Sequence, residues 1–390
     1  MIRMNHAEST SRGRRRKLAA PGAIVACLAL ALVAAAAGAK PVAPGSRTAG
    51  LQKDLDALVA AGAPGAILFV RDGSRITQLT GGVSNVARKT PMRTGDHFKI
   101  ASVTKAYTAT VVLQLVGEGK LGLNDSVEKR LPGVVPDGSK ITIRQLLNHT
   151  SGLYDFEVDP RYLKPYLSGN FGYYWSPRQL VDIAVAHKPL FAPGRGWSYS
   201  NTNYVVAQLI VERVTGSTIG AELRRRIFQP LHLRQTSYPN KPGVPSPFVH
   251  GYMLLGKPPV TDVTALSPSM APGSGGIVST ARDVADFYRA LLGGRLLARR
   301  ELKAMKTTVS EHTGGIAPGP QYGLGIGRVG GACPGWGHTG ELPGYEVSAA
   351  FSLDGRRQAI LIVNQDGTTL PKRAFALYNS LMGKAFCGRA

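Results

Sequence analysis

The segments with strand character lie at the two ends of this chain, and the segments between them have helical character. Near the N-terminus, GAILFV at 65–70 and SRITQLTGGV at 74–83 flank an Asp72-Gly73 turn. Near the C-terminus, YEVSAAFSLDG at 345–355 and RQAILIVNQ at 357–365 form a second hairpin signal. A sheet built from these segments has to join the two ends of the chain. This order predicts an α/β fold with an inserted, mostly helical region.

Four segments in the middle of the chain have the apolar periodicity of helices and are separated by long loops rich in Pro and Gly. They are ITIRQLLNHT, SPRQLVDIAVAH, TNYVVAQLIVERVTG and STARDVADFYRALLGG. Thr280, three residues before Asp283, is suited to cap the last of them. A final helix is expected over about 371–386. We assign residues from about 48–124 and 291–390 to the α/β part and about 125–290 to the helical part.

The first 39 residues have the pattern of an export signal. Five basic residues between Arg12 and Lys17 precede an apolar run, and Ala37-Gly38-Ala39 provides small residues for cleavage. We expect residues 40–390 to be one domain, secreted to the cell envelope, without a stable membrane span. Two alternatives stay open: an uncleaved membrane anchor, and lipid attachment at Cys27. A twin-arginine route is a further alternative to ordinary export.

The formal net charge of the chain is +23, and most of the basic residues are scattered. The one dense cluster, Arg224 to Arg226, lies in a helical pattern and is expected to be a solvated face. The sequence lacks the stripe of aromatic and basic side chains that binds nucleic acid, so nucleic acid is not an expected partner. An anionic cell envelope is the surface that this charge would meet.

Three cysteines are present, and Cys27 falls within the export signal. Cys333 and Cys387 remain as an even pair, which in an exported chain favours a disulfide over a metal site. We expect no metal, no cofactor and a monomeric protein.

The segment KIASVTKAYTATVVLQLVGEGKL (99–121) is an apolar helix that carries Ser102 and Lys105 near its start. The spacing S-x-x-K places both side chains on one helix face. A lysine that loses its proton on burial can activate a neighbouring hydroxyl for acyl transfer. The same spacing occurs at Ser126 and Lys129, but there the surroundings are polar and Glu128 favours a protonated lysine. Only the first pair is therefore a candidate nucleophile and base.

Two further short motifs supply the groups that such a site needs. Tyr199-Ser200-Asn201 precedes a helix, so its phenol can move a proton and its amide can bind a substrate amide. His338-Thr339-Gly340 fits a strand with a small residue where substrate approaches. Each motif has a second copy in a poorer context, at 238–240 and at 312–314. His149 could suggest a Ser-His triad, but we interpret it as a structural loop histidine.

Taken in order, S-x-x-K, Y-x-N and H-T-G resemble the serine D-alanyl-D-alanine carboxypeptidases and class C β-lactamases, a penicillin-recognising family. The similarity to secreted actinomycete carboxypeptidases covers nearly all of residues 50–388. It implies a five-stranded antiparallel sheet flanked by helices, plus a mostly helical region. It also implies that Ser102 attacks a carbonyl, that Lys105 and Tyr199 move protons, and that Asn201 positions the substrate.

The resemblance implies that His338, Thr339 and Gly340 line the substrate site, and that the backbone N–H groups of Ser102 and Glu341 form an oxyanion hole. The expected activity is that of an exported D-alanyl-D-alanine carboxypeptidase that works through an acyl-serine on peptidoglycan stem peptides. β-Lactams would acylate the same serine. An esterase or β-lactamase of the same fold, acting on other small acyl substrates, is the alternative. A non-catalytic sensor of cell-wall peptides is a third hypothesis.

One departure from the family bears on the substrate. Glu341 stands where these carboxypeptidases have a threonine that holds the terminal carboxylate, and Gly327, with Arg328 beside it, stands where they have an arginine. A carboxylate side chain repels a carboxylate substrate by roughly 1 kcal/mol or more. We include Arg328 as a candidate substrate contact. An esterase, an amidase or a D-amino-acid peptidase is therefore admissible.

Overall fold

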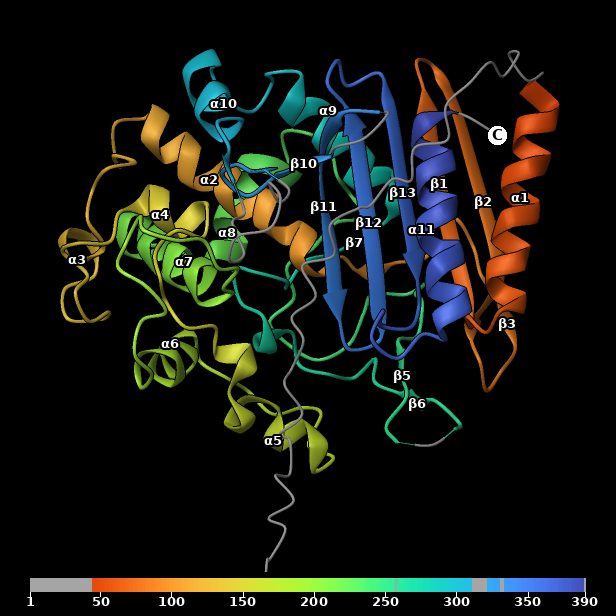
Figure 1. Cartoon of the computed structure of the whole chain (residues 1–390), viewed down its shortest axis with the longest axis horizontal. Coiled ribbons are helices and arrows are strands. Elements are labelled where there is room, and N and C mark those ends of the chain that lie inside the picture. The colour runs from red at the N-terminus through yellow and green to blue at the C-terminus, as the bar shows by residue number, and fades with distance from the viewer. Residues whose placement is uncertain (1–43, 257, 311–320, 330–332, 389–390) are drawn as a thin grey trace, which may run out of the picture.

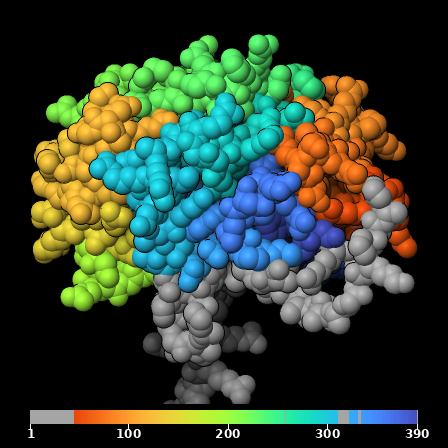
Figure 2. All heavy atoms as spheres, turned by 90° about the horizontal axis from the view of Figure 1, so that it is seen from above, coloured from red at the N-terminus to blue at the C-terminus, as the bar shows by residue number. Residues whose placement is uncertain are grey.

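The two ends of the chain meet in one antiparallel sheet, as the sequence predicts. The strands of this sheet are β1 (Gly65–Asp72), β2 (Arg75–Asn85), β3 (Thr90–Pro91), β8 (Val309–Ser310), β9 (Gln321–Tyr322), β10 (Gly327–Val329), β11 (Gly335–Leu342), β12 (Tyr345–Ser352) and β13 (Arg357–Val363). Their order is β3-β2-β1-β13-β12-β11-β10-β9-β8. The N-terminal strand β1 thus pairs with the C-terminal strand β13 (Figure 1). Figure 2 shows N-terminal residues in orange directly beside C-terminal residues in blue.

This computed structural model describes residues 44–256, 258–310, 321–329 and 333–388. The export signal predicted at 1–39 lies outside the described residues, and so does the second H-T-G copy at 312–314.

The sheet has more strands than the five that the family resemblance implies. Five strands of seven to eleven residues, β2, β1, β13, β12 and β11, form its centre. Strands of two or three residues extend it to nine strands at both edges. Such short strands have no apolar alternation of their own, so the sequence gives no sign of them. Two small pairs lie apart from this sheet: β4 (Phe98–Lys99) with β7 (Val278–Ser279), and β5 (Tyr252–Met253) with β6 (Thr261–Asp262).

The predicted helical segments are helices in the structure, and Thr280 caps its helix by accepting a hydrogen bond from the Asp283 N–H. The helices are α1 (Pro44–Ala60), α2 (Thr104–Gly117), α3 (Val127–Arg130), α4 (Ile143–Leu147), α5 (Pro160–Leu167), α6 (Pro177–Val185), α7 (Thr202–Thr215), α8 (Ile219–Leu223), α9 (Ala281–Leu292), α10 (Arg299–Met305) and α11 (Lys372–Cys387). Short helical turns are η1 (Ala101–Val103), η2 (Phe156–Val158), η3 (Arg224–Phe228) and η4 (Pro268–Met270).

Both faces of the sheet are covered, which explains the unbroken apolar runs at 66–70 in β1 and 359–363 in β13. In β1, Leu68 and Val70 belong to the core beneath α1 and α11. Ile67 and Phe69 belong to the second core, which continues into the helical region. Figure 1 shows α11 in front of the sheet, with α9 behind it and the helical region to one side.

Helix α2 lies between the sheet and the helical region and is buried on nearly all sides. Its Tyr107 ring stacks on Phe287 of α9, with 3.5 Å between the ring centroids, while α7 and α10 contact other parts of the helix. A helix without a solvent face is apolar all round. The apolar run around Lys105 therefore follows from its central position.

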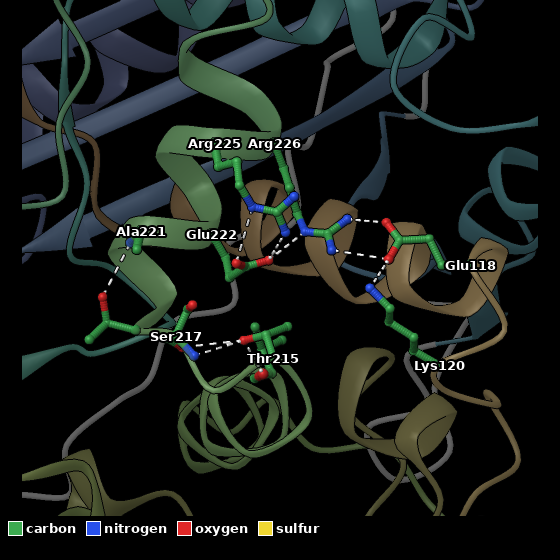
Figure 3. Close-up of polar contacts among 10 residues, drawn as sticks. Glu118, Lys120, Thr215, Ser217, Ala221, Glu222, Arg225 and Arg226 are labelled. Carbon is green, nitrogen blue, oxygen red and sulfur yellow. Dashed lines mark hydrogen bonds and ion pairs between the residues drawn. The ribbon is translucent and has the colours of Figure 1, made fainter.

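The arginine cluster differs from the expected solvated face. Arg224 and Arg225 are exposed, but Arg226 is only 9% exposed. The Arg226 guanidinium donates to Glu222 at 2.5 Å and also pairs with Glu118, at the end of α2 (Figure 3). Pairing and hydrogen bonds offset the cost of burying this charge. Arg226 therefore links η3 to α2 and is structural.

Cys333 and Cys387 form the predicted disulfide, with Cα atoms 5.5 Å apart. It ties the segment before β11 to the end of α11. Within the described ranges, no helix combines the length and apolar character needed to cross a bilayer.

Removing the disulfide should destabilise the fold. The cross-link spans a sequence separation of 54 residues, for which the chain-entropy relation gives a loss of roughly 4 kcal/mol in the Cys333→Ser/Cys387→Ser variant. Urea unfolding of wild type and variant measures this loss. Dithiothreitol should lower the wild-type midpoint to that of the variant and leave the variant unchanged. Equal midpoints without reductant would contradict a stabilising role.

Candidate active site

The backbone around Ser102 has an uncommon conformation. Ala101, the residue before Ser102, has φ of 50°, in the left-handed region that few L-residues adopt. Strand β11 passes directly beside it: a side chain at Gly340 would meet the Ile100 carbonyl oxygen at 2.5 Å and the Ser102 nitrogen at 3.2 Å. Glycine at 340 is therefore required for the close approach of β11 to the start of α2. This contact brings the first and last predicted motifs together.

Ser102 and Lys105 are hydrogen-bonded to each other. The Lys105 Nζ lies 3.0 Å from the Ser102 Oγ. Ser102 is partly exposed in η1, whereas Lys105 is fully buried in α2. A nucleophile within hydrogen-bond reach of a base is the arrangement that acyl transfer requires.

Lys105 has two more hydrogen bonds. Its Nζ donates to Asn201 Oδ1 at 2.6 Å and to the backbone oxygen of Ser274 at 3.2 Å. Nζ also lies 4.7 Å from the centroid of the Tyr199 ring. Oxygens from three residues thus lie around the Lys105 nitrogen. The first and second predicted motifs converge on this nitrogen.

Tyr199 lies in the loop before α7 and is partly exposed. Its ring lies among other rings, with centroids 4.4 Å from His149 and 6.3 Å from His338. It is therefore beside Lys105 and near β11. The second Y-x-N copy lies elsewhere: the Tyr238 hydroxyl donates to Gln208 and accepts from the Gly273 N–H.

His338 on β11 is held as a neutral ring. Its Nε2 lies 2.8 Å from the Tyr322 hydroxyl, and its Nδ1 contacts the Thr339 carbonyl oxygen. Burial, followed by the charge of Lys105, lowers the pKa of His338 to about 3. An imidazole that is uncharged at neutral pH can line the site beside Lys105 without adding positive charge. Thr339 beside it is partly exposed.

Glu341 ends the motif on β11 and is exposed. It lies directly across the strand pair from Glu346, and the Thr368 N–H donates to its Oε1 at 3.3 Å. Desolvation, followed by the carboxylate of Asp366, raises the pKa of Glu341. None of these three carboxylates forms an ion pair with a described basic side chain.

Arg328 is on β10, opposite Trp336 of β11, and its guanidinium carbon lies 5.4 Å from the centroid of that ring. It stacks on an aromatic face. Gly327 pairs with Gly337, next to His338. Arg328 therefore lies on the neighbouring strand near the motif, but the structure gives it no polar contact with the catalytic candidates.

The two alternatives that the sequence raised have structural roles. Ser126 caps α3 by accepting from the Lys129 N–H, and the Lys129 amine pairs with Asp125 at 2.8 Å. His149 is fully buried with φ of 63°, and its Nδ1 accepts from the Ser200 N–H at 3.2 Å. Neither supplies a second nucleophile or a triad base.

Sequence reasoning missed two acidic residues behind the site. Asp155 is 3% exposed, and its Oδ2 accepts from Asn201 Nδ2 at 3.1 Å. Burial raises the pKa of Asp155, and burial followed by the Asp155 charge raises the pKa of Glu157. The available signal was the pair of acids around Phe156 in GLYDFE, next to an apolar segment.

Comparison with known proteins agrees with this geometry. The Beta-lactamase family pattern matches residues 51–380. Penicillin-binding protein 4* of Bacillus subtilis is 26% identical over 333 residues, covering 78% of this chain and 69% of its own length. Penicillin-binding protein 4 of Amycolatopsis lactamdurans is 30% identical over 321 residues, covering 75% of this chain and 81% of its own length.

Two solved structures with similar folds are amide hydrolases. A D-stereospecific amidohydrolase from Streptomyces sp. is 39% identical with a TM-score of 0.80, and the match covers 88% of this chain and 99% of that chain. The D-amino acid amidase of Ochrobactrum anthropi SV3 is 29% identical with a TM-score of 0.77, and the match covers 87% of this chain and 97% of the amidase chain. With the family pattern spanning most of the chain, these matches show that this protein belongs to the Beta-lactamase family of serine hydrolases.

Proposed function

We propose that this protein is an exported D-stereospecific amidohydrolase that forms an acyl-enzyme at Ser102. The Ser102 Oγ attacks the substrate carbonyl, so a C–O bond forms and the C–N bond breaks. Lys105 in its uncharged form accepts the hydroxyl proton, and Tyr199 helps to pass a proton to the leaving nitrogen. Water then hydrolyses the ester and restores Ser102. The hydrogen bond between Lys105 Nζ and Ser102 Oγ is the observation that carries this proposal.

The remaining motif residues bind the substrate in this proposal. Asn201 contacts the substrate amide, while His338, Thr339 and Gly340 form the wall beside the acyl group. The backbone N–H groups of Ser102 and Glu341 stabilise the oxyanion. The close contact between β11 and the Ser102 nitrogen supports this placement.

The acidic surroundings of Glu341 favour substrates without a free terminal carboxylate. Glu341 is exposed, and Asp366 adds negative charge near it, whereas burial raises the pKa of Glu346 well above its usual range. A terminal carboxylate there would be repelled. An amide or ester of a D-amino acid has no such charge. The names of the two similar amidases support the same substrate class.

D-Alanyl-D-alanine carboxypeptidase activity is the second candidate. The similarity to penicillin-binding proteins of two bacteria favours it. Arg328 would then contact the terminal carboxylate after leaving its position on Trp336. The esterase and β-lactamase alternatives use the same acyl-serine chemistry.

We also propose that the protein works outside the cytoplasm, in the cell envelope, as a monomer. The disulfide supports an oxidising compartment. The basic and apolar residues of 1–39 support export.

The role of Ser102 can be tested with a matched pair of variants. Ser102→Ala should abolish covalent labelling by a fluorescent penicillin, because the acylated oxygen is removed. Ser126→Ala changes the serine of the other S-x-x-K and removes a helix cap, at a cost of roughly 1 kcal/mol, but should label like wild type. Labelling is measured by in-gel fluorescence. Persistent labelling of Ser102→Ala would exclude Ser102 as the nucleophile.

The role of Glu341 can be tested by neutralising it. Glu341→Gln should raise kcat/KM for a peptide that ends in D-Ala-D-Ala by about fivefold, which corresponds to roughly 1 kcal/mol of relieved repulsion. Hydrolysis of D-phenylalanine amide should change less. Glu346→Gln, a buried change directly across the strand pair, is the control and should leave the ratio of the two activities unchanged. A wild-type enzyme that prefers the peptide to the amide would overturn the proposed substrate class.

A further inference from the structure

Asp155 is a buried carboxylate for which the proposed chemistry has no role. It lies just before η2, 3% exposed, and its Oδ2 accepts from the side-chain nitrogen of Asn201 at 3.1 Å. The backbone N–H of Glu157 donates to its other oxygen at 3.2 Å. Asn201 in turn presents its amide oxygen to Lys105 at 2.6 Å. The Asn201 side chain thus connects Asp155 to Lys105, the residue whose amine lies beside Ser102.

The orientation of the Asn201 amide matters for Lys105. An asparagine side chain has an acceptor oxygen and a donor nitrogen, and rotation by half a turn exchanges them. If the Asn201 nitrogen were turned toward Lys105, two hydrogen-bond donors, Asn201 Nδ2 and Lys105 Nζ, would face each other. An ionised carboxylate only accepts hydrogen bonds, so Asp155 fixes the amide nitrogen on its own side. The oxygen is then left for Lys105.

The Asn201 amide lies between the side chains of Lys105 and Asp155, which carry opposite charges when both are ionised. Burial raises the pKa of Asp155, whereas the charge of the fully buried Lys105 lowers it and so favours the ionised carboxylate. Attraction between opposite charges is stronger in a buried site than in water.

We propose that Asp155 is a positioning residue: it holds the Asn201 amide with its oxygen on Lys105 and provides the buried countercharge of that amine. This inference rests on the proposed function of Lys105 and Ser102. Asp155 acts only through Asn201 and its charge.

Other titratable groups face the pair from the elements packed around it. Glu157 interacts with Asp155, Lys105 and Glu341, while Lys105 also acts on two histidines. The titratable side chains around the pair include Glu157, Tyr162, Tyr199, Tyr204, Glu341, His149 and His338. The Asp155 charge also raises the pKa of Glu157, after the effect of burial, so a difference between the pH profiles of wild type and the Asp155 variants reports on the charge of this acidic pair.

The test compares acylation of Ser102 by a fluorescent penicillin in wild type, Asp155→Ala and Asp155→Asn. Asp155→Ala frees the Asn201 amide and should slow acylation roughly a hundredfold, as misplacement of a catalytic group does. Asp155→Asn retains an acceptor oxygen without its charge and should recover part of that loss. An alanine variant that acylates at the wild-type rate would overturn the proposal.

Thr202→Val is the matched control. The Thr202 hydroxyl donates to the Tyr154 carbonyl oxygen at 2.7 Å and accepts from the Phe156 N–H at 3.2 Å, so it joins the same two segments as Asp155 and Asn201 do. The variant should melt at a lower temperature but acylate at nearly the wild-type rate below its melting temperature. A loss equal to that of Asp155→Ala would assign the effect to loop packing and refute a specific role for Asp155.

The pH profile tests the countercharge. Removal of a nearby negative charge disfavours the charged form of a cation, so the ascending limb of the acylation rate should move to lower pH in Asp155→Asn. If the ascending limbs of wild type and Asp155→Asn coincide, this part of the proposal is contradicted. Thr202→Val should keep the wild-type limb.

A crystal structure of Asp155→Ala gives a readout that is independent of activity. The contact between Asn201 Oδ1 and Lys105 Nζ should be lost or replaced. If that contact persists unchanged, Asp155 does not hold the amide, whether or not the protein reacts with penicillin. If wild type is not acylated but the variant shows the expected rotation, the proposed function fails while the positioning role stands.

Discussion

The burial of Lys105 is the constraint on which the rest of the site depends. An amine without solvent contact must find its hydrogen-bond partners within the protein, because an unsatisfied buried charge is strongly destabilising. Ser102, Asn201 and the Ser274 backbone provide those partners from three separate parts of the chain. The same contacts place a hydroxyl next to a potential base. The stability of the buried amine and the chemistry of the site thus have one structural origin.

The sheet provides the rigid side of this arrangement. Strand β11 is paired along its length with β12, which joins it to β13 and β1. Gly340 allows this strand to approach the backbone at Ser102. The disulfide holds the segment before β11 against the end of α11. A site assembled between a sheet and a buried helix keeps its groups within the small tolerances that acyl transfer needs.

The carboxylates differ in their positions and therefore in the tasks they can perform. Asp155 is buried and accepts a hydrogen bond from Asn201, so it can act only on the side chains around it. Glu341 is exposed after the H-T-G motif and can act on a substrate. Family membership fixes the acyl-serine chemistry, but the family includes enzymes with different substrates. The carboxylate of Glu341, directly after the H-T-G motif, is therefore the feature on which the proposed substrate class depends.

The sequence by itself determined the four strands near the chain ends, the helix that carries Lys105, the four helical segments of the middle region and the final helix, because apolar periodicity over many residues depends on which faces are buried. It did not determine the 17-residue helix α1. It also determined the Ser102–Lys105 pair, since a spacing of three along a helix is local. The three ordered motifs allowed the family to be recognised before their contacts were known. Tertiary structure alone decided the short edge strands, the burial of Arg226 and the contact of Asp155 with Asn201. These features depend on packing between segments far apart in the chain. No local sequence pattern specifies which distant group becomes the hydrogen-bond partner of a buried side chain.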